Sequence, residues 1–214
     1  MLLGTVTIAG MTVLSHITYA FPMARWEPNA PERLVRAALD LFTEQGYDAT
    51  TVNEIADRAG LTKTTFFRHF PDKREVLFAG QGLHARILAD AIAAAPGSAS
   101  PLETVGAALD ALAATFTDER REFSARLLPV IAGNRELQER AVFKHVGLVG
   151  AMTDALYERG VPEPAAGLAA ELGMRAFDRA FGRWVDPVNR ETLSLAELTR
   201  QALGEIRAAA VALG

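Results

Sequence analysis

The chain has 214 residues, of which half are apolar and 22% are charged, and it contains no cysteine. This composition argues against a disordered chain, and the missing cysteines exclude disulfides, thiolate zinc sites and cysteine nucleophiles. A net charge of -4 excludes a general polyanion binder. Any nucleic-acid surface must therefore be a local basic patch on an acidic body.

The first segment, residues 1–22, contains no Asp, Glu, Lys or Arg. Threonines and serines interrupt its apolar residues, so it is too polar for a membrane span, and it lacks the basic start of a signal peptide. We expect a poorly ordered extension that precedes a natural start at Met23 and is not part of the native protein. Two alternatives stay open: a native but frayed extension, and an export signal or anchor.

Residues 31–45 carry the apolar spacing of an amphipathic helix. Leu34, Ala38 and Leu41 recur on one stripe, with charged residues between them. Gly46 follows at the position where a glycine commonly ends a helix. The pattern therefore predicts one helix over 31–45.

Two shorter helices follow, joined by a glycine turn. Thr51 and Glu54 have the spacing of a capping box at the start of the second helix. Gly60 separates this helix from a third, in which Phe66 and Phe70 lie one turn apart on the same face. Two short helices joined by a tight turn form a helix-turn-helix.

The sequence then predicts a long fourth helix. Asp72 and Glu75 have capping-box spacing, and the helical pattern continues through Leu88. In this prediction Lys73 and Arg74 lie at the helix start. Backbone N–H groups and the positive end of the helix dipole favour a phosphate there.

The run from Thr51 to Lys73, TVNEIADRAGLTKTTFFRHFPDK, closely resembles the DNA-binding segment of TetR-type transcriptional regulators. The resemblance covers residues 31–77 with the spacing kept throughout. It implies an N-terminal three-helix helix-turn-helix DNA-binding domain over residues 23–78 and a helical ligand-binding and dimerisation domain over 79–214. It also implies a cytoplasmic regulator that binds a double-stranded DNA operator, as a repressor released by a small-molecule effector.

The residues that face DNA are expected in the same segment. With Phe66 and Phe70 in the core, the opposite face of the third helix is a polar and basic strip suited to a major groove. The family usually carries a tyrosine that meets a phosphate where this chain has Phe67, which can pack instead on a sugar or a thymine methyl. A pure capping role for Thr51 and a solvated position for Arg68 stay open. The predicted DNA-binding residues are Thr51, Val52, Asn53, Lys63, Thr64, Thr65, Phe67, Arg68, His69 and Lys73.

The rest of the chain is also helical in pattern. Ser100, Pro101 and Glu103 mark a helix start after a loop. Further helices are predicted from about residue 122 with a disturbance at Pro129, from 134 to about 159, over 164–184, and from 194 to the end. No segment shows the alternation of a strand. The predicted fold class is all-α, with about nine helices.

The last two helices carry more apolar surface than one core face needs, which favours a helix–helix seam. The resemblance points the same way, because these regulators form homodimers through their last two helices. Such a dimer sets two recognition helices about 34 Å apart, facing a near-palindrome.

The resemblance also implies a small-molecule pocket in the second domain, and the fourth helix as the element that couples it to DNA. Aromatic residues and methionines suit an adaptable apolar pocket and a lipophilic effector, although helical spacing makes ordinary core a competing interpretation for each of them. The predicted pocket residues are Phe116, Phe123, Arg126, Leu127, His145, Met152, Met174 and Phe177.

Enzymatic motifs are missing from the sequence. The four histidines have no metal-ligand spacing, and there is no P-loop, dinucleotide-binding glycine motif or nucleophile elbow. We therefore expect no catalytic activity, no cofactor, no metal and no membrane partner. The alternatives are a helical ligand-binding or scaffold protein with a degenerate DNA-reading head, suggested by Phe67 and the overall acidity, and, last, an enzyme.

Overall fold

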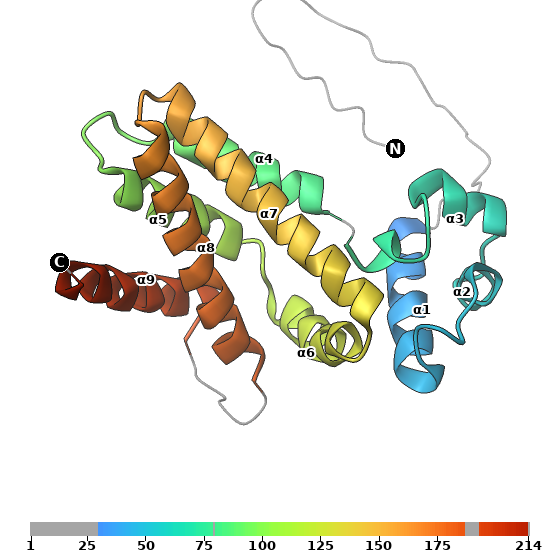
Figure 1. The fold of residues 1–214 in the computed structure, drawn as a ribbon. Coiled ribbons are helices and arrows are strands. Elements are labelled where there is room, and N and C mark those ends of the chain that lie inside the picture. The colour runs from blue at the N-terminus through green and yellow to red at the C-terminus, as the bar shows by residue number, and fades with distance from the viewer. Residues whose placement is uncertain (1–29, 79, 187–192, 214) are drawn as a thin grey trace, which may run out of the picture.

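The computed structural model describes residues 30–78, 80–186 and 193–213 of the chain. This part of the chain contains nine α-helices, one short 3-10 helix and no strand, as the all-α prediction requires (Figure 1). The predicted N-terminal extension, residues 1–22, lies outside the described residues. None of the helices that the structure describes is long and apolar enough to span a membrane.

The first three helices gather at one end of the molecule, and the other α-helices form the rest of it (Figure 1). At the first end lie α1 (Ala30–Gln45), α2 (Val52–Arg58), α3 (Lys63–His69) and the 3-10 helix η1 (Glu75–Phe78). The remaining helices are α4 (Gln81–Ala94), α5 (Pro101–Ala113), α6 (Asp118–Ala132), α7 (Arg135–Glu158), α8 (Glu163–Val185) and α9 (Leu195–Ala212).

Local capping signals fix where several helices begin. Each expected Ser/Thr–Glu pair forms a complete capping box, in which the hydroxyl accepts a backbone N–H and the carboxylate accepts one in return. At α2, the backbone N–H of Thr51 donates to Glu54 Oε2 at 2.8 Å. The confirmed boxes are Thr51 with Glu54, Ser100 with Glu103, and Ser194 with Glu197.

The prediction of one continuous fourth helix from Asp72 is wrong. The Asp72 carboxylate does accept the backbone N–H groups of Arg74 and Glu75, at 2.9 and 3.1 Å, but only the single turn of η1 follows. Gly80 then adopts a left-handed conformation with φ of 88°, and α4 begins after it. An α-helix cannot continue through that geometry, which glycine adopts readily.

The sixth helix also differs from expectation. It begins at Asp118, four residues before the expected start, because the Thr117 side chain accepts the backbone N–H of Arg120 at 3.4 Å. Pro129 lies inside α6, and the helix continues past it to Ala132. Pro129 therefore falls in the last turn of the helix and does not end it.

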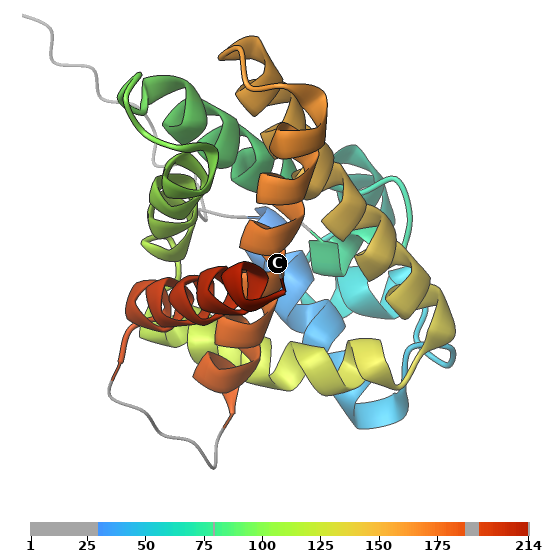
Figure 2. The ribbon, with the colours of Figure 1, turned by 60° about the vertical axis from the view of Figure 1, so that its left-hand side comes forward.

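Two clusters of buried apolar side chains form the interior. One is shared by α1, α2, α3 and η1, and the other by α4, α5, α7, α8 and α9. Figure 2 shows the arrangement of the helices from a second direction. Leu137, in the first turn of α7, is fully buried in the first cluster, and Phe123 and Leu127 of α6 pack against it. The DNA-binding part predicted from the sequence therefore rests on α6 and α7.

Candidate nucleic-acid interface

Helix α3 is anchored by its aromatic side. Thr62 caps its start, with the Thr65 backbone N–H donating to the Thr62 hydroxyl at 3.1 Å. Phe66 is fully buried, and Phe70 is 6% exposed with its ring centroid 5.6 Å from that of Phe66. This anchoring fixes which face of α3 points to solvent.

The opposite face of α3 is exposed. Lys63, Thr64, Phe67, Arg68 and His69 all point to solvent in the structure. Five of the six residues predicted on this helix therefore share an accessible surface. Thr65, the sixth, is half-buried, and its hydroxyl lies 3.0 Å from that of Thr62.

The start of α2 presents fewer free groups. The Thr51 hydroxyl lies 2.7 Å from Glu54 Oε2 and also caps the helix, so both of its hydrogen-bonding functions are in use. Val52 packs against the first core cluster, and Asn53 is exposed. On α2, Asn53 is thus the predicted residue with an accessible polar group.

Lys73 has internal partners that sequence reasoning missed. Its Nζ atom donates to the carbonyl oxygens of Tyr47 and Thr50 at 2.7 and 2.9 Å, and lies 4.0 Å from the centroid of the Tyr47 ring. Burial lowers the pKa of Lys73, while Asp48 and Glu136 act in the opposite direction. Since α4 begins only after Gly80, Lys73 does not lie at the start of a long helix, as the sequence predicted.

The remaining cations near α3 differ in their pairing. Arg74 forms ion pairs with Asp72 at 2.8 Å and Glu136 at 3.2 Å. By contrast, Lys63 and Arg68 are exposed and form no ion pair with any described residue. Of these three cations, the two that form no ion pair with a described residue both lie on α3.

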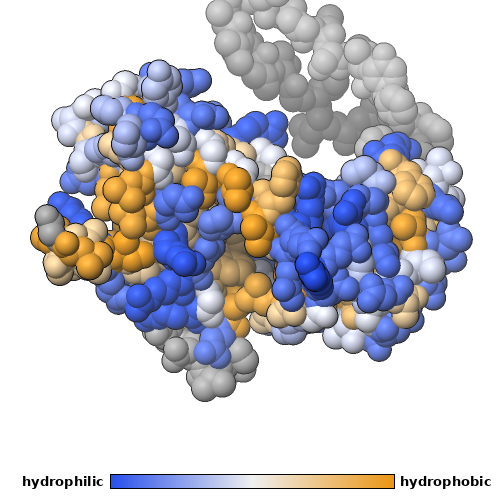
Figure 3. Space-filling view, in the orientation of Figure 1, coloured by the Kyte–Doolittle hydropathy of each residue, from blue (hydrophilic) through white to orange (hydrophobic). Residues whose placement is uncertain are grey.

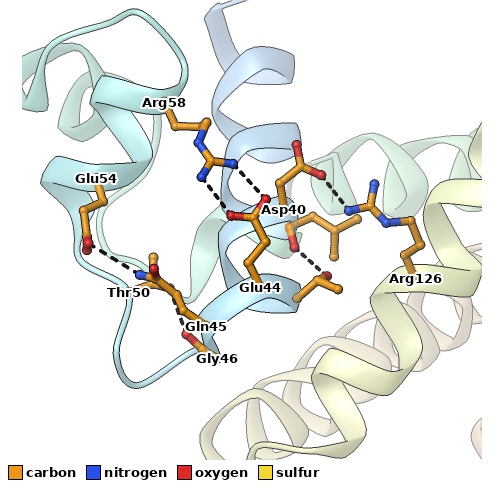
Figure 4. Close-up of polar contacts among 10 residues, drawn as sticks. Asp40, Glu44, Gln45, Gly46, Thr50, Glu54, Arg58 and Arg126 are labelled. Atoms are coloured by element: carbon orange, nitrogen blue, oxygen red, sulfur yellow. Dashed lines mark hydrogen bonds and ion pairs between the residues drawn. The ribbon is translucent and has the colours of Figure 1, made fainter.

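A polar network behind α2 holds the helix-turn-helix together (Figure 4). Arg58 donates two hydrogen bonds to the Glu44 carboxylate, at 3.0 and 2.8 Å, which join α2 to α1. The hydrogen bond from Arg58 lowers the pKa of Glu44. Gln45 adds weaker contacts to Thr50 and Glu54, at 3.3 and 3.5 Å. These pairs position α2 without using the outer face of α3.

Ion pairs and hydrogen bonds also join the first domain to α6 and α7. Arg126, a predicted pocket residue, instead pairs with Asp40 of α1 at 2.6 Å (Figure 4). Glu75 of η1 accepts from Arg140 and from Lys144, the latter at 3.1 Å. The Glu75 side chain is only 14% exposed. Sequence reasoning had no signal for these contacts, because the partners are far apart in the chain.

The predicted pocket residues divide between the two core clusters. Phe116 contacts Phe177, with ring centroids 5.9 Å apart, in an aromatic group that includes Phe181 and Trp184. Met152 and Met174 are buried in the same cluster. Phe116, Phe177, Met152 and Met174 therefore belong to one interior.

The other predicted pocket residues lie elsewhere. Phe123 and Leu127 pack against the cluster of the first domain. The Nδ1 atom of His145 lies 3.4 Å from Asp178 Oδ2 at the α7–α8 junction, where burial raises the pKa of Asp178. A surface depression of about 210 Å³ lies between α5 and α9, and none of the predicted residues lines it.

Comparisons with known proteins agree with this geometry. Residues 34–80 match the family model for bacterial regulatory proteins of the tetR family. The chain is 32% identical over 112 residues to the HTH-type transcriptional regulator TcmR of Streptomyces glaucescens, covering 47% of this chain and 50% of TcmR. It is 36% identical over 87 residues to the regulator BetI of Rhizobium meliloti, covering 40% of this chain and 43% of BetI. The matches thus span half or less of these relatives.

Solved structures share the fold over most of the chain. FadR of Thermus thermophilus, a TetR-family repressor solved in complex with lauroyl-CoA, has a TM-score of 0.53 at 23% identity, covering 82% of this chain and 92% of FadR. SmeT, the repressor of the Stenotrophomonas maltophilia efflux pump SmeDEF, has a TM-score of 0.51 at 21% identity, covering 85% of this chain and 90% of SmeT. At these identities the likeness shows the fold alone.

Proposed function

Because the chain belongs to the TetR family of bacterial regulators, we propose that it is a sequence-specific DNA-binding transcriptional regulator that acts in the cytoplasm. One observation carries the proposal. Buried Phe66 fixes α3 so that Lys63, Thr64 and Arg68 point outward. Other charged side chains nearby, such as those of Arg58 and Arg74, form ion pairs instead. A helix with such a face enters a major groove, where lysine and threonine read base edges and arginine contacts phosphate.

The proposed active unit is a homodimer that pairs the outer faces of α8 and α9. Figure 3 supports a seam in this part of the molecule, because apolar surface gathers over the C-terminal helices and the surface over α1–α3 is mainly hydrophilic. On α9, Ala208 and Ala209 are exposed, and Leu168 of α8 is 61% exposed. Small exposed residues allow close helix packing, and large apolar ones gain from burial.

The proposed regulation is release from the operator by a lipophilic effector. A site among Phe116, Phe177, Met152 and Met174 has the adaptable apolar side chains that such a molecule needs. FadR, whose fold is similar, was solved with lauroyl-CoA, and both FadR and SmeT are described as repressors. These descriptions support repression here.

We propose that α6 and α7 couple the effector site to the DNA-binding helices. The sequence instead pointed to the fourth helix for this role. Leu137 completes the first core cluster, and Glu75 pairs with Arg140 and Lys144 of α7. An effector that shifts α7 therefore moves the DNA-binding helices α1, α2 and α3 through these direct contacts. In this proposal each of the two ligands, DNA and effector, favours one arrangement of a shared element, which is what allostery requires.

Selection from a pool of random DNA duplexes by the full-length chain tests the proposal. We expect enrichment of a near-palindrome whose half-sites lie about one helical turn apart. The alternative of a scaffold with a degenerate reading head predicts no enrichment over the starting pool. Lys63→Ala is the control variant, because it removes a proposed DNA contact. Lys63 is exposed and forms no ion pair with a described residue, so α3 should stay folded.

A further inference from the structure

Phe67 is an unusual residue on the outer face of α3. Among residues 30–78 it is the one exposed side chain of the Val, Leu, Ile, Met, Phe, Tyr and Trp types, with 48% of its surface accessible. A single exposed apolar side chain needs no explanation by itself. Its position does, because Phe67 lies one turn after Lys63 and Thr64, on the face proposed to read DNA.

The Phe67 ring is also held in place. It packs edge-on against the fully buried Phe66, with ring centroids 5.5 Å apart and an interplanar angle of 80°. Aromatic pairs favour this arrangement. The Phe67 ring is therefore held by a buried partner, and little side-chain entropy is lost when another molecule covers its exposed part.

A ring without a donor or acceptor can recognise one feature of the major groove. Each base pair presents hydrogen-bonding groups there, and thymine adds a 5-methyl group, which apolar side chains contact. On this basis, and given the DNA-binding function proposed above, we infer that Phe67 is a specificity-determining residue that selects a thymine by its methyl group in each half-site.

Helix geometry gives the position of this thymine. Phe67 lies four positions after Lys63, so their Cα atoms are offset by roughly 6 Å along the helix axis. Successive base pairs are about 3.4 Å apart. The thymine contacted by Phe67 lies within about two base pairs of the base contacted by Lys63.

Single thymine-to-deoxyuridine replacements in the selected duplex test this inference, because they remove one methyl group and leave every hydrogen bond intact. Affinities are measured by fluorescence anisotropy for the wild type, Phe67→Ala and Leu83→Ala. One buried methyl group is worth about 0.8 kcal/mol, so we expect about fourfold weaker binding per half-site at one thymine. Phe67→Ala should show equal affinities for the two duplexes. Leu83→Ala removes another exposed apolar side chain, on α4, and should behave as wild type.

The comparison stays valid if Phe67→Ala is partly unfolded, because the ratio of its affinities for the two duplexes does not depend on the active fraction. Sequence-specific binding with no thymine at this spacing, or with no sensitivity to deoxyuridine, would overturn the role of Phe67 alone. Sensitivity that persists in Phe67→Ala would overturn it too. No enrichment of any sequence in the selection would instead reject the DNA-binding function on which it rests.

Discussion

The ammonium group of Lys73 donates to the carbonyl oxygen of Tyr47 at 2.7 Å and lies 4.0 Å from the centroid of the Tyr47 ring. A second bond, to the Thr50 carbonyl at 2.9 Å, ties the segment between α3 and η1 to the turn between α1 and α2. Lys73 therefore holds the start of the helix-turn-helix in place. A lysine has three N–H donors, so one remains for a phosphate.

We predict that Lys73→Met lowers the free energy of unfolding by about 1–3 kcal/mol, because two backbone carbonyls lose a charged donor. Urea denaturation followed by circular dichroism measures this change. Lys63→Met is the matched control, since Lys63 is exposed and unpaired, and it should change stability by less than about 0.5 kcal/mol. Equal stability of Lys73→Met and the wild type would show that the Lys73 contacts contribute nothing.

Glu75 gives a prediction with a defined pH dependence. Burial acts to raise the pKa of Glu75, but the hydrogen bonds and charges of Arg140 and Lys144 outweigh it, and the net pKa is lowered. A carboxylate with a lowered folded pKa contributes stability that is present above its unfolded pKa, about 4.3, and is lost as the pH falls through the folded value. Glu75→Gln should therefore destabilise the protein at pH 7 and much less at pH 3.

Chemical denaturation of the wild type and Glu75→Gln at both pH values measures this difference. Glu139→Gln is the control, because Glu139 forms an exposed i,i+4 pair with Arg135 and should have little effect at either pH. A destabilisation of Glu75→Gln that is the same at pH 3 and pH 7 would contradict the ion-pair explanation.

Gly173 allows α8 to approach α5 closely. A Cβ atom at this position would lie 2.2 Å from Val105 Cγ1, and Val105 is fully buried. We expect overpacking in Gly173→Ala to lower the free energy of unfolding by about 1–3 kcal/mol. The melting temperature should fall accordingly. Gly147→Ala, at an exposed position of α7, meets nothing within 4 Å and should stabilise the helix by about 0.5–1 kcal/mol. A stabilised Gly173→Ala variant would show that the two helices can separate without cost.

A charged substitution on the outer face of α9, in the proposed dimer interface, tests the homodimer. Ala208→Glu places two carboxylates between the paired helices, so its dimer should dissociate at concentrations where the wild type stays dimeric in sedimentation equilibrium. Val146→Glu serves for comparison, because Val146 of α7 is 61% exposed and lies outside the proposed seam. Dissociation of Val146→Glu with an intact Ala208→Glu dimer would move the seam to α7.

Sequence reasoning succeeded where the information is local. The capping boxes at Thr51, Ser100 and Ser194 join residues three positions apart, so their spacing is visible in the sequence. The buried side of α3 follows from the one-turn spacing of Phe66 and Phe70 in the same way.

The failures involve contacts between distant segments. Lys73 binds residues 23 and 26 positions earlier in the chain, and Glu75 binds α7. Most of the predicted pocket residues are apolar side chains at helical spacing. That pattern shows that Phe123 and Phe177 face inward, but it does not show that they face different cores.

The measurement that tests DNA recognition most directly is the ratio of affinities for the selected duplex and a scrambled duplex, by anisotropy at physiological salt. We predict a ratio of about 10³ or more for the wild type, as expected of a sequence-specific regulator. In Lys63→Ala the ratio should fall by about 30-fold or more, because one base contact worth about 1 kcal/mol or more is lost from each of the two half-sites. A wild-type ratio near one, with α3 folded, would contradict the assignment of this surface as a DNA-reading head.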